Sequence, residues 1–470
     1  MGLIGYNRMR FLCECLRDLD AGFRLYGGRL FVVESKMPHV LQQLSKEFRI
    51  EKITWDQDCE ALYHPRDDAV KETCETLGIA WIERLGHTLW NPEDILEANG
   101  EEPPLTQAAF LQVATSLGHP DRPRGKVDLS DVSFLKSDGV SDGLKKELKL
   151  FDGVPDPADF GFRATRPHET PYWMGGECRG LDLLSRRLEQ EARAFQDGIC
   201  RVTQTRPNIL APATSLSPYL RFGCVSVRRM YWEIQDLYEE VRGGASTAHV
   251  HLIDQLIWRE FFYVMSARNP HYDKMEENPI CLNIRWDDDP VALACWEEGM
   301  TGYPLIDAFM RQLKEEGWIH HLGRNLVAQF LTRGAMWLSW VPGLRHFLRY
   351  QLDADWSVCS GNWMWISSSA FEKVLDCSHC LSPVTFGKRL EPSGEFVRRY
   401  VPELQNFPTE WIYQPWQAPE SVQEKSGCVI GKDYPLPIVD YAQASQRCRY
   451  VSVFQKNVIM NLSFYLRIPE

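Results

Sequence analysis

The chain has 470 residues and a formal net charge of −12, from 52 basic and 64 acidic side chains. With 44% hydrophobic and 25% charged residues it has a globular composition, and its length suffices for two or three domains. The acidic balance disfavours sequence-independent binding of duplex DNA, which depends on lysine and arginine, and favours protein partners. No apolar run reaches the ~18 residues of a membrane span, so no membrane is expected among its partners.

The fourteen cysteines show no paired spacing, and the first residues contain no apolar signal region. We therefore expect reduced thiols in a reducing compartment. The segment Cys377-Ser-His379-Cys380 has metal-ligand residue types, but no second CxxC accompanies it. A loop with reduced thiols is favoured there over a zinc site.

Residues 6–150 alternate between helical and strand-like patterns, which predicts a parallel α/β sheet. The predicted helices are Arg8–Leu19, Val40–Phe48 and Asp67–Leu77, and the predicted strands are Gly28–Glu34, Ile50–Trp55 and Ile79–Ile82.

Residues 100–171 are rich in Pro, Gly, Asp and Ser and predict an extended connector. From Gly180 onward, apolar residues recur at a spacing of about 3.6, which predicts a helical domain. Its predicted helices are Leu181–Phe195, Val227–Val241, Leu252–Ala267, Gly302–Glu316, Leu326–Trp340 and Trp363–Leu375. The predicted parts are an α/β domain in 1–100, a connector in 101–179, a helical domain in 180–441 and a tail in 442–470.

Polar and aromatic side chains gather in two stretches, GWIHHLGRN from Gly317 and LDADWSVCSGNWMW ending at Trp365. Arg324, Asp353 and Asp355 can form a buried charge cluster, because buried charges need partners. A cavity between helices, lined by aromatic rings and a few polar groups, suits a flat organic cofactor.

Other motifs have plainer interpretations on pattern alone. The turn PATSLSP at 212–218 offers hydroxyls and backbone N–H groups to a phosphate, although such strings are most often simple helix caps. The helix over Asp254–Tyr263 is by pattern an amphipathic core helix. Most of the sixteen tryptophans can be core residues, because aromatic side chains bury large areas. Cys359 can be a small buried filler.

The two stretches resemble the flavin-binding signature of the cryptochrome/photolyase family, and WSVCSGNWMWISSSAFEK is most similar to the light-sensing (type I) cryptochromes of insects. The resemblance runs from GYNRMRFL at Gly5 to about Tyr441. It implies an α/β parallel-sheet (Rossmann-like) domain followed by an all-α FAD-binding domain of photolyase type. Family members begin with a further strand and helix, including WFR-like and LRxxDN-like motifs that are absent here. We therefore expect an incomplete first domain, from a truncated or alternatively started product.

The resemblance also implies FAD as the cofactor and assigns its surroundings. It assigns no catalytic residues. It implies three groups of cofactor-binding residues: Arg187, Thr214, Ser215 and Ser217 at the pyrophosphate; Gln255, Trp258 and Arg259 lining the pocket; and His321, Arg324, Asp353, Asp355 and Cys359 near the flavin. The family's electron-transfer chain matches Trp363, Trp340 and Trp286.

Two positions depart from the photolyase pattern. By its spacing from Trp363, Cys359 matches the residue facing flavin N5, where photolyases commonly carry Asn and plant cryptochromes Asp. A thiol, with a reference pKa of about 8.5, is a poor proton source, so a flavin that gains an electron in light is expected to stay anionic. His64 and Pro65 match an Asn-Glu pair that holds a folate antenna in photolyases. Proline offers neither a donor nor a charge, so no folate antenna is expected.

Relatives that repair (6-4) lesions use two histidines four residues apart, whereas here His321 is followed by Asn325, so one acid/base partner is missing. We predict a blue-light flavoprotein photoreceptor of the circadian clock, not an enzyme. The alternatives are a light-independent transcriptional repressor, against which Cys359 argues, and a DNA photolyase.

By resemblance the partners are the clock proteins Timeless and Period and an F-box ubiquitin ligase subunit, in cytoplasm and nucleus, without DNA binding. Residues 447–470 lack the aromatic tail of insect members and are expected to be disordered or partly helical, which would weaken light gating of partner binding.

Overall fold

The computed structural model describes residues 4–125, 127–163, 171–197, 208–210, 214–243, 251–371 and 380–465. The chain forms two compact units. The α/β unit comprises Gly5–Thr205 and Ala213–Pro270, and the helical unit comprises Met1–Ile4, Arg206–Pro212 and His271–Glu470. This division runs across the predicted helical domain, whose boundaries stay a prediction.

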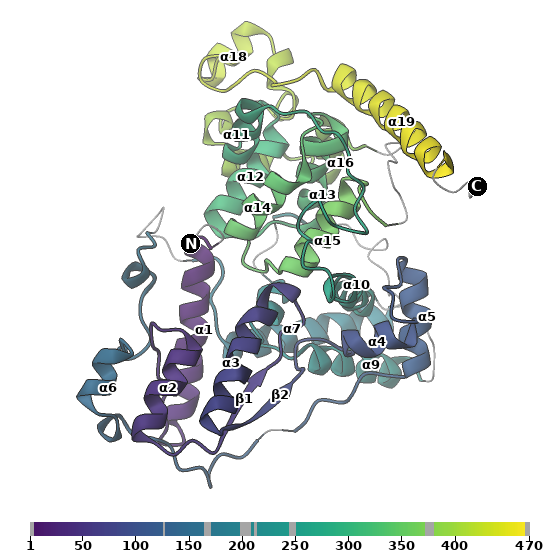
Figure 1. The fold of residues 1–470 in the computed structure, drawn as a ribbon. Coiled ribbons are helices and arrows are strands. Elements are labelled where there is room, and N and C mark those ends of the chain that lie inside the picture. The colour runs from purple at the N-terminus through teal and green to yellow at the C-terminus, as the bar shows by residue number, and fades with distance from the viewer. Residues whose placement is uncertain are drawn as a thin grey trace. The chain divides into compact units, whose positions relative to one another are not determined.

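The α/β unit contains both strands of the described chain and the first ten helices (Figure 1). In chain order its elements are α1 (Tyr6–Arg24), α2 (Met37–Glu47), β1 (Lys52–Asp56), α3 (His64–Leu77), β2 (Ala80–Arg84), α4 (Pro92–Ala98), α5 (Gln107–Leu117), α6 (Asp142–Glu147), α7 (Glu177–Gln196), α8 (Ser217–Arg221), α9 (Val227–Arg242) and α10 (His251–Ser266).

The sheet of this unit consists of β1 and β2, which pair in parallel with Lys52 opposite Ala80. Helix α3 connects them and ends at Gly78, whose φ of 66° is the left-handed conformation that favours glycine. Leu41, Val70, Cys74 and Ile79 form the core between these helices and the sheet. The predicted parallel α/β class is confirmed.

The predicted strand at Gly28–Glu34 is wrong. Within it only Val33 pairs, as a single antiparallel bridge to Leu150. Phe31 and Val33 pack against a core cluster of Val40, Val140, Leu144 and Leu148. The apolar run is therefore buried by contacts with side chains from residues 140–150 rather than by a sheet.

The predicted extended connector is also wrong in part, because α5 and α6 lie within it. Thr106 caps α5 by accepting a hydrogen bond from Ala109 N at 3.1 Å, and Phe110 on that helix is buried. Ser141 caps α6 in the same way through Leu144 N. The surrounding stretch is rich in Pro, Gly, Asp and Ser, so composition dominated the prediction and these two helices were missed.

The helical unit holds the remaining elements. They are α11 (Pro290–Glu298), α12 (Pro304–Glu316), α13 (His321–Gln329), η5 (Phe330–Gly334), α14 (Trp340–Tyr350), α15 (Trp356–Ile366), α16 (Pro383–Leu390), α17 (Glu395–Tyr400), α18 (Glu420–Ser426) and α19 (Tyr441–Tyr465).

The predicted helix Leu326–Trp340 is interrupted. Helix α13 passes into the π-type turn η5, where Thr332 leaves helical geometry with φ −97° and ψ −116°. Helix α14 then starts afresh, with Ser339 accepting a hydrogen bond from Val341 N. The predicted helix Trp363–Leu375 begins earlier, at Trp356, and ends at Ile366. Its last predicted residues lie outside the described ones.

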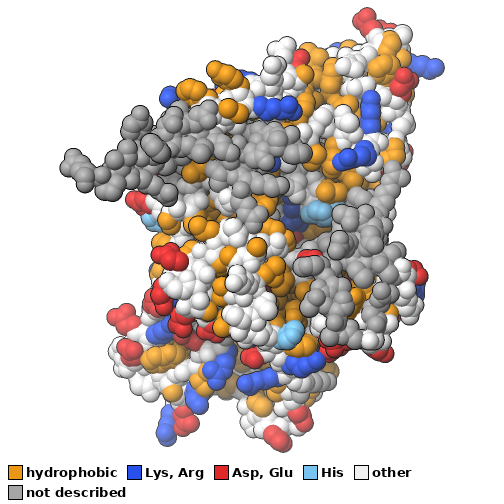
Figure 2. All heavy atoms as spheres, turned by 90° about the vertical axis from the view of Figure 1, so that its right-hand side faces the viewer, with side chains coloured by type: hydrophobic (Ala, Val, Ile, Leu, Met, Phe, Trp, Pro, Cys, Tyr) orange, Lys and Arg blue, Asp and Glu red, His pale blue; other side chains and the backbone are white. Residues whose placement is uncertain are grey.

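The predicted divergent tail is helical as far as Tyr465, as the yellow helix α19 in Figure 1. None of the described helices combines the length and hydropathy required to cross a bilayer. On the described part of the face drawn in Figure 2, acidic and basic side chains are interspersed among apolar and uncharged ones.

Candidate functional site

The helical unit brings together Arg324, Asp353, Asp355 and Cys359, which the family resemblance assigned to the flavin. Arg324 on α13 lies with its Nη2 2.9 Å from Asp353 Oδ2, and its Nε donates to Ile319 O at 2.9 Å. Asp353 also accepts from Gln351 Nε2 at 2.5 Å. Because the Asp353 side chain is only 6% exposed, the guanidinium supplies the partner that its charge requires.

Asp355 positions the next helix. Its side chain accepts a hydrogen bond from Val358 N at 3.2 Å and so caps α15. One turn on, Cys359 N donates to Asp355 O at 2.9 Å, as expected for the first turn of a helix. The cap thereby fixes the thiol relative to both carboxylates.

Cys359 is buried, with 7% of its surface exposed. Burial, reinforced by the negative charges of Asp353 and Asp355, raises the pKa of its thiol to about 12. The thiol therefore keeps its proton at neutral pH and is a weak acid. The raised pKa is consistent with the prediction that the Cys359 thiol is a poor proton donor.

Two histidines stand at the start of α13, with their rings 4.2 Å apart. His320 caps the helix through Leu322 N, and burial together with the neighbouring His321 and Arg324 lowers its pKa to about 4. His320 is therefore neutral at pH 7, whereas His321 is exposed. Asn325, at the position of the second repair histidine, donates to His321 O at 3.2 Å.

Trp363 on α15 packs against α14, the helix that Trp340 begins. Its ring contacts the backbone at Gly343 and lies edge-on to Phe347 at 5.2 Å and to Trp296 at 6.1 Å. Trp340 is fully buried.

The third predicted tryptophan, Trp286, pairs with Trp337 at a ring-centre distance of 4.8 Å. Sequence reasoning missed Trp337, although its position three residues before Trp340 was a usable signal. Cys448 and Val451 of α19 pack in the cluster around this pair. Arg447 forms an ion pair with Asp287 at 2.6 Å. The divergent C-terminal helix therefore covers the end of the predicted electron-transfer chain.

The α/β unit holds the other predicted cofactor residues. Ser215 and Ser217 share a hydrogen bond between their hydroxyls at 2.9 Å, at the start of α8, and Thr214 is exposed beside them. Arg187 on α7 pairs with Glu191 at 2.7 Å. Its Nε is shielded from solvent without an acceptor among the described residues. A shielded guanidinium N–H of this kind fits a phosphate group.

The predicted residues on α10 differ in their surroundings. Gln255 is exposed, and Trp258 packs on Phe261. Arg259 lies in a network that the sequence did not predict: it donates to Glu260 at 2.7 Å and lies 2.8 Å from His87 Nε2.

Glu260 is the buried member of that network, with 2% of its surface exposed. It accepts a hydrogen bond from Leu89 N at 2.6 Å. Burial raises the pKa of its carboxyl to about 7, against the lowering effect of Arg259. The network ties α10 to the segment after β2.

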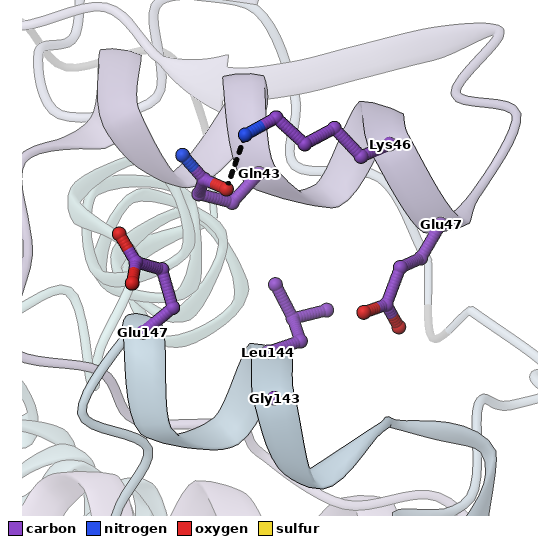
Figure 3. A pocket seen from close by; sticks show the side chains of 6 residues that line it. All are labelled: Gln43, Lys46, Glu47, Gly143, Leu144 and Glu147. Atoms are coloured by element: carbon purple, nitrogen blue, oxygen red, sulfur yellow. Dashed lines mark hydrogen bonds between the residues drawn. The ribbon is translucent and has the colours of Figure 1, made fainter.

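A separate cavity of about 330 Å³ in the α/β unit lies between α2 and α6 (Figure 3). Its lining includes Lys46, Glu47 and Glu147, and Lys46 donates to Gln43 at 2.8 Å. None of the predicted cofactor residues lines it. Among the described residues no group of His, Cys, Asp and Glu can hold a metal ion, and Cys377 and His379 lie outside those residues.

Comparison with known proteins identifies the family. Residues 252–452 match the FAD binding domain of DNA photolyase, and residues 2–124 match DNA photolyase. Over 453 residues the chain is 49% identical to Cryptochrome-1 of Anopheles gambiae, covering 95% of this chain and 82% of that protein. The chain belongs to the cryptochrome/photolyase family.

Other relatives agree with this assignment. Cryptochrome-1 of Drosophila melanogaster is 45% identical over 461 residues, covering 94% of this chain and 84% of that protein. A class III photolyase from Agrobacterium tumefaciens gives a TM-score of 0.77 at 26% identity, covering 96% and 89% of the two chains. A Synechocystis cryptochrome gives 0.77 at 24% identity, covering 95% and 89%, which supports the fold alone.

These comparisons confirm the predicted family, the fold class and FAD as the cofactor. The named relatives support a cryptochrome-type photoreceptor, although the fold is shared with photolyases. In the α/β unit, the shielded Nε of Arg187 has no acceptor among the described residues, which fits a phosphate of FAD. In the helical unit, the Arg324–Asp353 pair offers polar groups to a cofactor. The individual cofactor and electron-transfer assignments stay predictions.

Proposed function

We propose that this chain is a blue-light photoreceptor of the circadian clock. Bound FAD would supply the absorption of blue light. Trp363 would be the electron donor beside it, with Trp340 and Trp286 as the next members of the chain. Arg324 and Asp353 hold the charge pair beside the reacting region. The signal is read by Timeless, Period and an F-box ubiquitin ligase subunit, in cytoplasm and nucleus.

The observation that carries the proposal is the environment of Cys359. The thiol is buried one turn after Asp355, and its pKa is raised to about 12. A residue that holds its proton so tightly does not neutralise a negative charge generated beside it by light. The cation nearest to this thiol in the cluster is Arg324, whose guanidinium pairs with Asp353 at 2.9 Å. A change in charge beside the Arg324–Asp353 pair can alter the interactions of these residues, and light can cause it without any reaction of a substrate.

The proposal is also supported by the residue four positions after His321, where relatives that repair (6-4) lesions have a second histidine. Asn325 stands one helical turn after His321 and donates its amide to His321 O. An amide cannot take the place of the second histidine as an acid or base near neutral pH. This favours a receptor over a repair enzyme.

The proposal is tested with purified protein, FAD and purified Timeless. We expect FAD to co-purify, its blue absorption to bleach under illumination, and Timeless to bind more tightly in light than in darkness. Bleaching without any light-dependent binding would overturn the clock role. Protein that binds Timeless or Period without FAD would indicate the repressor, and loss of thymine dimers or (6-4) products from a duplex would indicate a photolyase.

A further inference from the structure

Two thiols of the α/β unit lie in contact although they are far apart in the sequence. Cys15 lies on α1, and Cys224 lies in the turn between α8 and α9, 209 residues later. Their Sγ atoms are 3.4 Å apart, and both are half-buried, unbonded thiols. The two sulphur atoms are therefore in van der Waals contact and within reach of small reagents.

The backbone at the start of α7 closes over this pair. A Cβ on Gly175 would lie 2.9 Å from Cys15 Sγ and would collide with Phe11 O, so only glycine permits this approach. The N–H of Gly176, the residue before α7, faces both sulphurs. Helix α1 lies beside α7 (Figure 1).

This setting favours a negative charge on one sulphur. The contact between the two sulphurs lowers the pKa of the Cys224 thiol and raises that of Cys15. Gly176 N–H and the start of helix α7 act in the same direction on Cys224. Burial of the Cys224 thiol opposes it, and the carboxylates Glu177 and Asp18 oppose it more weakly. The result is a more acidic thiol in contact with a second thiol, the pairing that thiol–disulfide chemistry requires.

A metal is a poorer match for this site. In the parts of the chain that are described, no third His, Cys, Asp or Glu side chain completes a ligand group. A disulfide needs a sulphur–sulphur bond of ~2.05 Å, so the two atoms must approach by ~1.4 Å.

We propose that Cys15 and Cys224 are an oxidative modification site that forms a reversible disulfide in response to hydroperoxides. The Cys224 thiolate attacks the peroxide, the O–O bond breaks, and an alkoxide or hydroxide leaves and takes a proton from water. Cys224 then carries a sulfenic acid. The Cys15 sulphur displaces its hydroxyl, which leaves as water with the Cys15 proton. In total the two sulphurs lose two electrons and the hydroperoxide gains them. A small dithiol then reduces the disulfide back to two thiols.

A bond between these two sulphurs would join α1 to the turn after α8. Closing a loop of 209 residues restricts the unfolded chain. We expect the oxidised protein to unfold several degrees higher than the reduced protein, and to lose that gain when treated with dithiothreitol.

The test uses the full chain treated in darkness with hydrogen peroxide, followed by alkylation and non-reducing peptide mass spectrometry. We expect a linked peptide containing Cys15 and Cys224, abolished by dithiothreitol, with both thiols lost from alkylation together. Phenylarsine oxide, which requires two adjacent thiols, should protect both from peroxide.

The matched control is Cys178→Ser. Cys178 is an exposed thiol at the start of α7, where Asp18 raises its pKa. This variant should form the linked peptide as the wild type does, whereas Cys15→Ser should leave Cys224 as a sulfenic or higher acid. Oxidation of Cys15 and Cys224 at independent rates, without a linked peptide in the wild-type protein, would overturn the proposal. This last measurement uses only the wild-type protein, so it does not depend on whether a variant folds.

Discussion

The sharpest consequence of the Cys359 environment concerns the substitution Cys359→Asp. Burial and two carboxylates raise the pKa of the native thiol by about three pH units, to about 12. At about 1.4 kcal/mol per pH unit, this corresponds to about 4 kcal/mol of free energy against a negative charge at this position. A carboxyl group in the same place meets the same burial and the same Asp353 and Asp355.

The sign follows from linkage. The aspartate introduced at position 359 has its pKa raised in the folded protein and ordinary in the unfolded chain, so the unfolded chain releases its proton first. The variant should be least destabilised below pH ~4, and should lose up to about 4 kcal/mol of unfolding free energy as the pH rises toward neutrality. The neutral isostere Cys359→Asn should show no such additional pH dependence.

Thermal unfolding of the two variants between pH 5 and pH 8 measures this difference. We expect the midpoint of Cys359→Asp to fall relative to Cys359→Asn as the pH rises. A second readout is proton uptake on illumination, followed with an indicator dye. The wild-type thiol should bind no additional proton on illumination. The carboxyl group of Cys359→Asp should change its proton occupancy. Parallel melting curves for the two variants at every pH would refute the reasoning.

Three further outcomes follow from the same structure. Gly343→Ala would place a methyl group against the Trp363 ring; we expect about 1–3 kcal/mol of lost stability, measured by thermal unfolding, and slower flavin bleaching. Glu260 has a pKa raised to about 7, so its burial costs stability as pH rises from about 4.5 to about 7; Glu260→Gln should remove up to ~3 kcal/mol of that pH dependence in urea titrations. Arg187→Ala should weaken FAD retention in equilibrium dialysis about tenfold or more, whereas the exposed neighbour variant Arg186→Ala should not.

Local signals in the sequence predicted many elements well. Helix α3 ends at Gly78 because only a residue tolerant of positive φ closes it there, and the apolar runs on either side became β1 and β2. The cap at Asp355 could be read from the sequence in principle, but the prediction placed that helix seven residues late. Periodicity alone does not mark where a buried helix begins.

The failures have a different cause. Apolar residues recur at helical spacing across residues 326–340, so spacing alone does not show that Thr332 leaves helical geometry. The pairing of Trp286 with Trp337 and of Arg259 with His87 joins residues 51 and 172 positions apart. Such contacts depend on tertiary packing, which neither propensity nor spacing encodes. The family resemblance supplied Arg324, Asp353 and Cys359 as a set, and the structure added the charge balance between them.

Light-driven electron donation from Trp363 is tested most directly by illuminating FAD-loaded Trp363→Phe beside Trp365→Phe. The control residue lies on the same helix, two positions later, with its ring 6.0 Å from Phe371. We predict that the blue absorption of Trp363→Phe bleaches far more slowly than that of the wild type, while Trp365→Phe bleaches normally. Equal bleaching of Trp363→Phe and wild-type protein would contradict the account.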